Sequence, residues 1–211
     1  MTFELTRPRR SRAGERGVAA APLVLILGLI FSLPLVASAQ ALDLNGEKAL
    51  IADTRDGAST RIGSVLFEPS AGDNPAGRTA FRVKIDASVM RDYFLSMREF
   101  KCLPAEAEVS CFVPYPYSQP GTIASGDLVW LEHSLLFLYK QPRDFGAKLW
   151  NGVIFKLTPT PDGKGFTGQP QAVDLNHISG PPEDLTKPPY GPMDRADFPA
   201  GARWVTQLRV E

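Results

Sequence analysis

Cys102 and Cys111 stand close together near the middle of the chain, and they are the only two cysteines among its 211 residues. Two cysteines without a cluster of further cysteines and histidines cannot complete a structural zinc site, which takes four ligands. A redox-active pair would more naturally have the C-x-x-C spacing. In an oxidising compartment, two cysteines are most simply a structural disulfide. We therefore predict a β-hairpin within residues 94–117 that a Cys102–Cys111 disulfide closes.

Residues 1–39 have the order of regions found in a secretory signal peptide. Five arginines precede an apolar run over residues 17–36, and Ala37-Ser38-Ala39 forms a small-x-small cleavage pattern. The apolar run is longer than the usual signal-peptide core of about 7–15 residues, so an uncleaved membrane anchor is the alternative. We expect an exported protein, periplasmic or secreted, that meets the membrane only through this segment if it stays uncleaved.

The charge balance argues against nucleic acid as a partner. The chain has 23 basic and 23 acidic residues, of which five arginines and two glutamates lie in residues 1–39. The remaining 18 basic and 21 acidic residues leave a slight negative surplus and no basic block. The 19 prolines and 18 glycines favour many turns over long helices.

Period-two alternation predicts several β-strands. In residues 79–86, Phe81, Val83 and Ile85 alternate with charged residues, which is typical of a half-buried strand. Comparable segments elsewhere bring the expected total to about eight strands. Short helices are expected after Ser88 and after Asp127.

The predicted domain organisation follows from where these strands lie. Residues 40–60 show no period and are expected to be loosely ordered. Residues 61–211 are expected to form a single β-rich domain that includes a proline-rich loop at residues 179–202.

No βαβ rhythm is present, so the predicted class is antiparallel all-β. An up-and-down barrel of about eight strands with two short helices fits best, and a β-sandwich is the alternative. Trp150-Asn151-Gly152 precedes one predicted strand, and Asp162-Gly163 forms the hairpin turn after it. This order is similar to that of small exported lipocalin-like barrels. The resemblance covers only the later half of the chain and carries over no site residue.

Two histidines provide the candidate catalytic groups. His133 follows Glu132, and His177 lies near Asp174, so each pair is a weak candidate for a general base with an orienting carboxylate. The alternative is that both histidines are structural. No spacing typical of a metal site, no G-x-S-x-G elbow and no glycine-rich nucleotide loop is present. We therefore expect no metal and no cofactor, and a periplasmic hydrolase or isomerase is kept only as an alternative function.

A group of aromatic and basic residues provides the candidate ligand-binding site. Its members are Arg98, Lys101, Tyr115, Tyr117, Trp130 and Trp150. The aromatic rings would line a barrel interior, and the two cations would meet an acidic ligand or an anionic lipid headgroup. The alternative is that the rings form the core and the cations are solvated.

The favoured function is a non-catalytic exported β-domain that binds a small apolar or amphipathic ligand or an envelope component. A further alternative is a structural or assembly factor that docks through residues 179–202.

Overall fold

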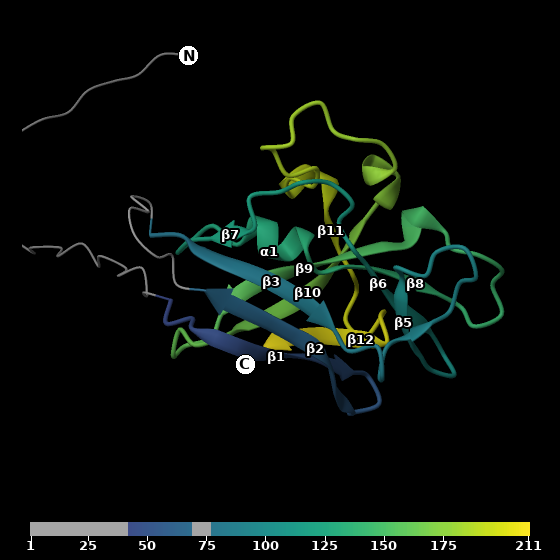
Figure 1. Ribbon diagram of the computed structural model, residues 1–211. Helices are drawn as coiled ribbons and strands as arrows, with labels where there is room; N and C mark the ends of the chain where they lie inside the picture. Colours follow the sequence, from purple (N-terminus) through teal and green to yellow (C-terminus); the bar gives the residue numbers. More distant parts are fainter. Residues whose placement is uncertain (1–41, 69–76) are drawn as a thin grey trace, which may run out of the picture. The chain divides into compact units, whose positions relative to one another are not determined.

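The computed structural model describes residues 42–68 and 77–211, and these residues form an antiparallel all-β architecture (Figure 1). They all belong to one compact unit, Ser38–Glu211. The predicted signal peptide at residues 1–39 lies outside the described residues, as does most of the loop that follows residue 68.

Twelve strands occur in the described part of the chain. They are β1 (Gly46–Thr54), β2 (Ser59–Glu68), β3 (Thr79–Ile85), β4 (Arg91–Asp92), β5 (Lys101–Pro104), β6 (Val109–Val113), β7 (Thr122–Ile123), β8 (Leu136–Lys140), β9 (Gly152–Pro159), β10 (Phe166–Val173), β11 (Ala196–Asp197) and β12 (Val205–Val210). One α-helix, α1 (Val129–His133), and three short 3₁₀ helices, η1 (Leu149–Asn151), η2 (Leu175–Ile178) and η3 (Pro192–Asp194), complete the secondary structure of these residues.

The strands pair into one sheet in the order β4-β5-β6-β8-β9-β10-β12-β1-β2-β3-β7, and β11 adds to β10. The antiparallel all-β prediction is confirmed. The expected count of about eight strands was too low, because β4, β7 and β11 have only two residues each and show no readable period. Among the described strands, the two ends of the sheet are not paired with each other, so closure into a barrel is not observed.

β1 corrects the expectation that residues 40–60 are loosely ordered. This strand lies inside the sheet, where Leu50 is opposite Gly63 of β2 and opposite Val210 of β12. Leu50 and Ala52 are buried. The small and polar residues of β1 hide its period, but hydrogen bonding to a neighbour on each side holds it in place.

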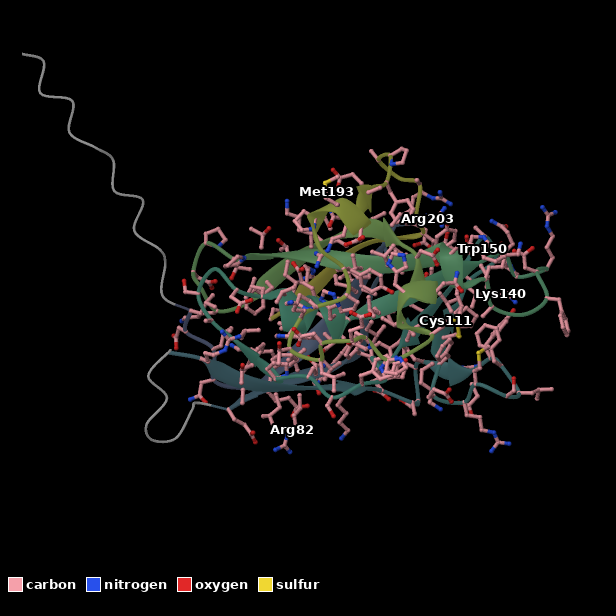
Figure 2. All side chains as sticks on the ribbon, turned by 90° about the horizontal axis from the view of Figure 1, so that it is seen from above. Arg82, Cys111, Lys140, Trp150, Met193 and Arg203 are labelled. Atoms are coloured by element: carbon pink, nitrogen blue, oxygen red, sulfur yellow. A yellow bond between two sulfur atoms is a disulfide. The ribbon has the colours of Figure 1, made fainter. Side chains whose placement is uncertain are left out.

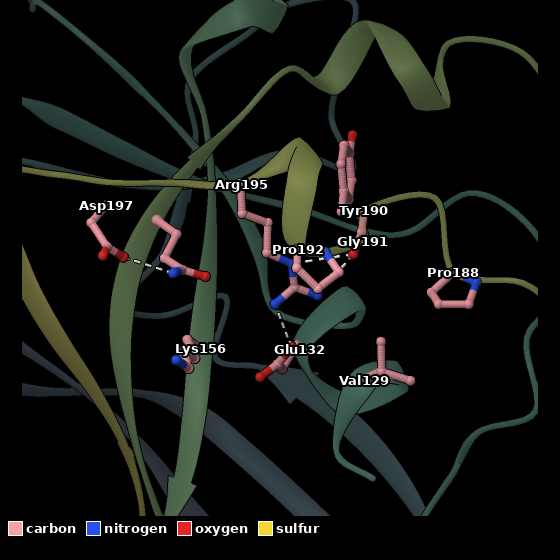
Figure 3. Close-up of a pocket in the computed structure, with 10 residues that line it drawn as sticks. Val129, Glu132, Lys156, Pro188, Tyr190, Gly191, Pro192, Arg195 and Asp197 are labelled. Carbon is pink, nitrogen blue, oxygen red and sulfur yellow. Dashed lines mark hydrogen bonds and ion pairs between the residues drawn. The ribbon is translucent and has the colours of Figure 1, made fainter.

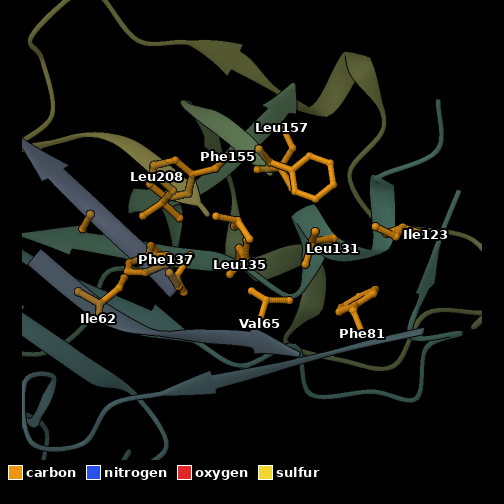
Figure 4. Close-up of a cluster of buried hydrophobic side chains, with 14 of the residues drawn as sticks. Ile62, Val65, Phe81, Ile123, Leu131, Leu135, Phe137, Phe155, Leu157 and Leu208 are labelled. Carbon is orange, nitrogen blue, oxygen red and sulfur yellow. The ribbon is translucent and has the colours of Figure 1, made fainter. Parts of the chain in front are cut away.

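The main hydrophobic core brings together strands that are far apart in the sheet order. Side chains from β1, β2 and β3 meet side chains from β8, β9, β10 and β12, so the sheet curls back on itself (Figure 4). Phe137 and Phe155 pack edge to face with their ring centroids 5.5 Å apart, and Leu131 of α1 adds to the same cluster. Side chains therefore fill the space that the sheet encloses.

A second cluster covers the opposite face of β8 and β9. Leu136 and Leu138 of β8 and Ile154 of β9 contribute to it, together with the Cys102–Cys111 disulfide. The disulfide prediction is confirmed, with the two cysteines directly opposite each other in the β5–β6 hairpin. Because both faces of β8 and β9 are buried, these strands form the hydrophobic centre of the fold.

Two local predictions differ in outcome. The helix expected after Asp127 is confirmed as α1, whereas the helix expected after Ser88 is wrong. The carboxylate of Asp86 accepts hydrogen bonds from the backbone and hydroxyl of Ser88, which fixes a turn. β4 then begins at once, because Arg91 pairs with Cys102.

The predicted hairpin turn at Asp162-Gly163 is confirmed. β9 and β10 pair continuously from Gly152 opposite Val173 to Pro159 opposite Phe166. Gly163 has a φ of 69°, in the left-handed region where a residue without Cβ is favoured.

Replacement of Phe81 tests which face of β3 is buried in the core. Phe81 is 6% exposed and belongs to the main core, so Phe81→Asp would bury an unpaired carboxylate. We expect the free energy of unfolding to fall by about 4 kcal/mol or more, as measured by urea denaturation.

Lys84→Asp is the matched control, because Lys84 lies on the same strand with its side chain exposed. We expect this variant to unfold close to the wild-type midpoint. A Phe81→Asp variant that is soluble and as stable as the Lys84→Asp variant would contradict the observed facing.

Candidate functional site

The proline-rich segment at residues 179–202, called the strap from here on, lies against α1 and β10. β11 of the strap pairs with β10, where Gln171 is opposite Asp197 and Ala172 is opposite Ala196. Tyr190 is fully buried, although the strap has little regular structure. The strap is therefore part of the folded domain.

A buried ion pair holds the strap on α1. Arg195 donates to Glu132 with 2.6 Å between Nη1 and Oε2, and each side chain is only about a tenth exposed. The other oxygen of Glu132 accepts the backbone N–H of Leu157, and Arg195 donates twice more to the carbonyl of Tyr190. Glu132 thus connects α1, β9 and the strap.

The imidazole of His133 is buried, and both of its nitrogens are engaged. Nδ1 lies 2.7 Å from the carbonyl oxygen of Val129, and Nε2 accepts the backbone N–H of Tyr190 at 3.1 Å. This pair of partners fits a neutral ring protonated at Nδ1. Burial lowers the pKa of His133 from its ordinary value of 6.5 to about 4, with a smaller contribution from Arg195 in the same direction. Neither nitrogen is free to act as a general base.

His177 lies on the other side of Tyr190. The ring of Tyr190 is stacked between the two histidines, with centroids 5.5 Å from His133 and 5.9 Å from His177. Oδ1 of Asp174 accepts hydrogen bonds from the backbone and side chain of Asn176, and the Asp174 carbonyl accepts the Tyr190 hydroxyl. Burial raises the pKa of that hydroxyl. Asp174 therefore caps η2 and is not seen to orient the exposed ring of His177.

No candidate metal site is found in residues 42–68 and 77–211. Within these ranges, no three His, Cys, Asp or Glu side chains come close enough together to hold an ion. The stacked ring of Tyr190 separates the two histidines, and histidine is the commonest metal ligand in proteins.

A surface groove follows the strap (Figure 3). One part, about 590 Å³ in volume, is lined by the strap together with α1, β9 and β10. A second part of about 490 Å³ shares Lys156 and Asp197 with the first. Asp197 accepts a hydrogen bond from Gln171 in its wall. The groove is open and mixed in polarity, and the largely buried cations in its walls, Arg195 and Arg203, are already paired with Glu132 and Glu108.

The candidate ligand-binding residues fall into two groups. Tyr115, Tyr117 and Trp130 pack against one another, with Tyr115 also in contact with the ring of His133. The Tyr117 hydroxyl donates to the carbonyl of Ile178, whereas the Tyr115 hydroxyl is buried with no hydrogen-bond partner among the described residues. This group packs between the two core clusters.

Of the other three candidates, Arg98 lies on the loop before the disulfide hairpin, Lys101 begins β5 of that hairpin, and Trp150 lies in η1. Arg98 is exposed, Lys101 forms an ion pair with Asp92, and Trp150 is 64% exposed. The structure therefore does not bring the six predicted residues to one site.

An apolar cleft of about 380 Å³ lies beside the disulfide hairpin. Six hydrophobic residues of its wall are Met97, Phe100, Val113, Leu149, Leu175 and Ile178. Its polar side chains are those of Glu99 and Ser179. None of these six hydrophobic residues was among the predicted site residues. Their only signal was hydrophobicity, which also describes a core residue.

No family model, no curated protein and no solved structure matches this chain. The disulfide is compatible with the predicted export to an oxidising compartment.

None of the helices in the described part of the chain has the length and apolar character needed to span a membrane.

Removal of Arg195 tests whether the ion pair holds the strap. Arg195→Ala would leave the carboxylate of Glu132 buried without its charge partner, which typically costs about 3–5 kcal/mol. We expect a loss of stability of that size in urea denaturation, with faster proteolysis within residues 179–202.

Lys187→Ala serves as the control, because it breaks an exposed ion pair with Asp184 within the same strap. We expect almost no change in either measurement. Equal behaviour of the two variants would contradict a holding role for Arg195.

The lowered pKa of His133 predicts a pH-dependent stability. Between about pH 6.5 and 4 the unfolded chain binds a proton at this histidine and the folded chain does not, so acidification favours unfolding. Over this window His133 should account for a loss of about 3 kcal/mol.

The measurement is the urea midpoint of the wild type and of His133→Gln at a series of pH values. The difference between the two pH slopes isolates His133 from Glu108, whose pKa is raised by burial in spite of Arg203. Parallel slopes would show that His133 does not titrate in this way.

Proposed function

We propose that this chain is an exported, non-catalytic β-domain that binds a small apolar or amphipathic ligand in the apolar cleft beside the Cys102–Cys111 hairpin. The main support for the proposal is the contrast between the filled hydrophobic core and the open apolar cleft at the surface. Side chains occupy the enclosed core, and the cavity between Phe137, Phe155 and Arg203 has a volume of only about 10 Å³. The apolar cleft offers about 380 Å³ at the surface.

The size and chemistry of the cleft support this proposal. Small-molecule sites typically have volumes of about 300–1,000 Å³ and mostly hydrophobic walls with few polar groups. The cleft meets both criteria, with Glu99 and Ser179 available to a polar end of the ligand. One wall includes Val113, two residues after Cys111, so the disulfide restrains part of the site before a ligand binds.

The bonding of the candidate catalytic residues supports a binding function over a hydrolase or isomerase. Both nitrogens of His133 and both oxygens of Glu132 are used in contacts that hold α1 and the strap. Breaking these contacts to perform proton transfer would leave buried polar groups unsatisfied.

The architecture that accompanies this proposal is an open, filled barrel. Pairing continues without interruption from β8 to β3, and α1 contacts both β7 and β9. The helix would thus lie between β7 and β9, which are not paired with each other in the sheet. A β-sandwich is the alternative description.

A fluorescent fatty acid that brightens on transfer from water is the probe for this proposal. We expect saturable binding to the full chain and a loss of affinity of about ten-fold or more in Ser179→Trp. Ser179 is exposed at the wall of the cleft, so a tryptophan there would fill the site without disturbing a core residue.

Ala58→Trp is the control, because Ala58 is exposed in the turn between β1 and β2. We expect wild-type affinity from this variant. Equal binding by both tryptophan variants, or no saturable binding by the wild type, would refute the proposed site.

A further inference from the structure

Large hydrophobic side chains are exposed mainly on two loops at one end of the described structure. These loops, taken together with the strand and 3₁₀-helix residues at their ends, span residues 91–101 and 140–150 and are called the tip. Six large hydrophobic side chains are exposed in the described residues, and four of them belong to the tip: Tyr93, Leu95, Phe145 and Trp150. Leu95 and Phe145 are about as exposed as in an extended chain, at 98% and 102%. Folding therefore leaves Leu95 and Phe145 in water, so these two side chains gain no hydrophobic stabilisation from burial within the described residues.

The two loops lie side by side. The Tyr93 hydroxyl donates to the carbonyl of Pro142 at 3.4 Å, and the ammonium of Lys140 lies 5.0 Å from the centre of the Tyr93 ring. Lys140 and Trp150 lie at the same end of the described structure, close to Cys111 (Figure 2). The exposed hydrophobic residues are thus carried by two loops that are packed against each other beside the disulfide.

The tip also differs in charge from the rest of residues 40–211. Its two loops contain six basic and three acidic residues, whereas the remaining positions contain 12 basic and 18 acidic residues. Lys101 and Lys148 form ion pairs with acidic residues of the tip. Arg91, Arg98 and Arg143 are exposed, and none of them forms an ion pair within the described part of the chain.

We propose that the tip docks on the surface of a lipid bilayer that carries anionic headgroups. Leu95, Phe145 and Trp150 would enter the interfacial region, where aromatic and aliphatic side chains partition favourably. Arg91, Arg98 and Arg143 would contact the lipid phosphates, since basic residues near an anionic surface add to the binding free energy.

Two features favour a bilayer over a protein partner. Leu95 and Phe145 are almost fully exposed and lie on separate segments, so a partner of fixed shape would have little to complement. A fluid surface adapts to such side chains, and three exposed guanidinium groups match repeated phosphates. The docking does not require a ligand in the apolar cleft, and it goes beyond the function proposed above.

Co-sedimentation of the full chain with vesicles tests the proposal. One set contains equal parts phosphatidylglycerol and phosphatidylcholine, and the other contains phosphatidylcholine alone. We expect stronger partitioning to the anionic vesicles, weakened by added salt, with a blue shift in tryptophan emission as Trp150 leaves water.

Two variants separate the charged and apolar contributions. In Arg91→Ala/Arg98→Ala/Arg143→Ala, we expect the anionic preference to fall about five-fold for each arginine removed. In Leu95→Ser/Phe145→Ser/Trp150→Ser, we expect binding to fall at least ten-fold on anionic vesicles. Thermal unfolding of each variant would verify that it remains folded.

The matched control is Lys84→Ala/Lys164→Ala/Lys187→Ala, which removes three exposed positive charges outside the tip. We expect it to bind as the wild type does. Equal loss in this control, or unchanged binding in both tip variants, would overturn the proposal. Binding through an uncleaved leader would be shared by every variant and would show no dependence on the tip.

The fatty-acid assay distinguishes this proposal from the cleft. Ser179→Trp, which lies outside both tip loops, should retain vesicle binding while losing the soluble probe. Loss of vesicle binding in Ser179→Trp alone, with both tip variants unaffected, would assign the lipid contact to the cleft and refute docking by the tip.

Discussion

The carboxylate of Glu132 is the point on which the arrangement of α1, β9 and the strap depends. One oxygen accepts the backbone N–H of Leu157 in β9, and the other accepts from Arg195 of the strap. Arg195 in turn donates to the carbonyl of Tyr190, whose own N–H is bound by His133. A helix of five residues has little stability of its own, so these tertiary contacts hold it in place. Residues that resemble an acid–base pair in the sequence therefore form a structural junction.

The filled core changes where a binding function is to be sought. Aromatic residues that would line a hollow barrel instead pack against one another, as Phe137 does with Phe155 and Tyr115 with Trp130. The outer face of β8 and β9 carries its own hydrophobic cluster, and the apolar cleft opens at the edge of that cluster. The cleft and the tip thus lie near the disulfide hairpin, which restrains both.

A feature of the structure could be predicted where a short stretch of sequence was enough to specify it. The alternation around Phe81, the turn at Gly163 and the Cys102–Cys111 disulfide follow from short-range chemistry, and the structure confirms them. β1 could not be predicted in this way, because its place depends on pairing with β12 about 160 residues later in the chain. The candidate site was harder to predict than the fold. Trp150 and Arg98 were identified by residue type, whereas the cleft is formed by Leu175 and Met97, which resemble any core residue.

The strands at the two ends of the sheet affect whether copies of this protein can associate by pairing their edges. An unpaired strand edge can template pairing with another chain, and natural proteins counter this with very short or charged edge strands. β4 and β7 have two residues each, and β4 consists of Arg91 and Asp92. β3, next to β7, presents Arg82 and Lys84 to solvent. The short end strands and the charges on β3 therefore disfavour growth by strand addition of a second copy.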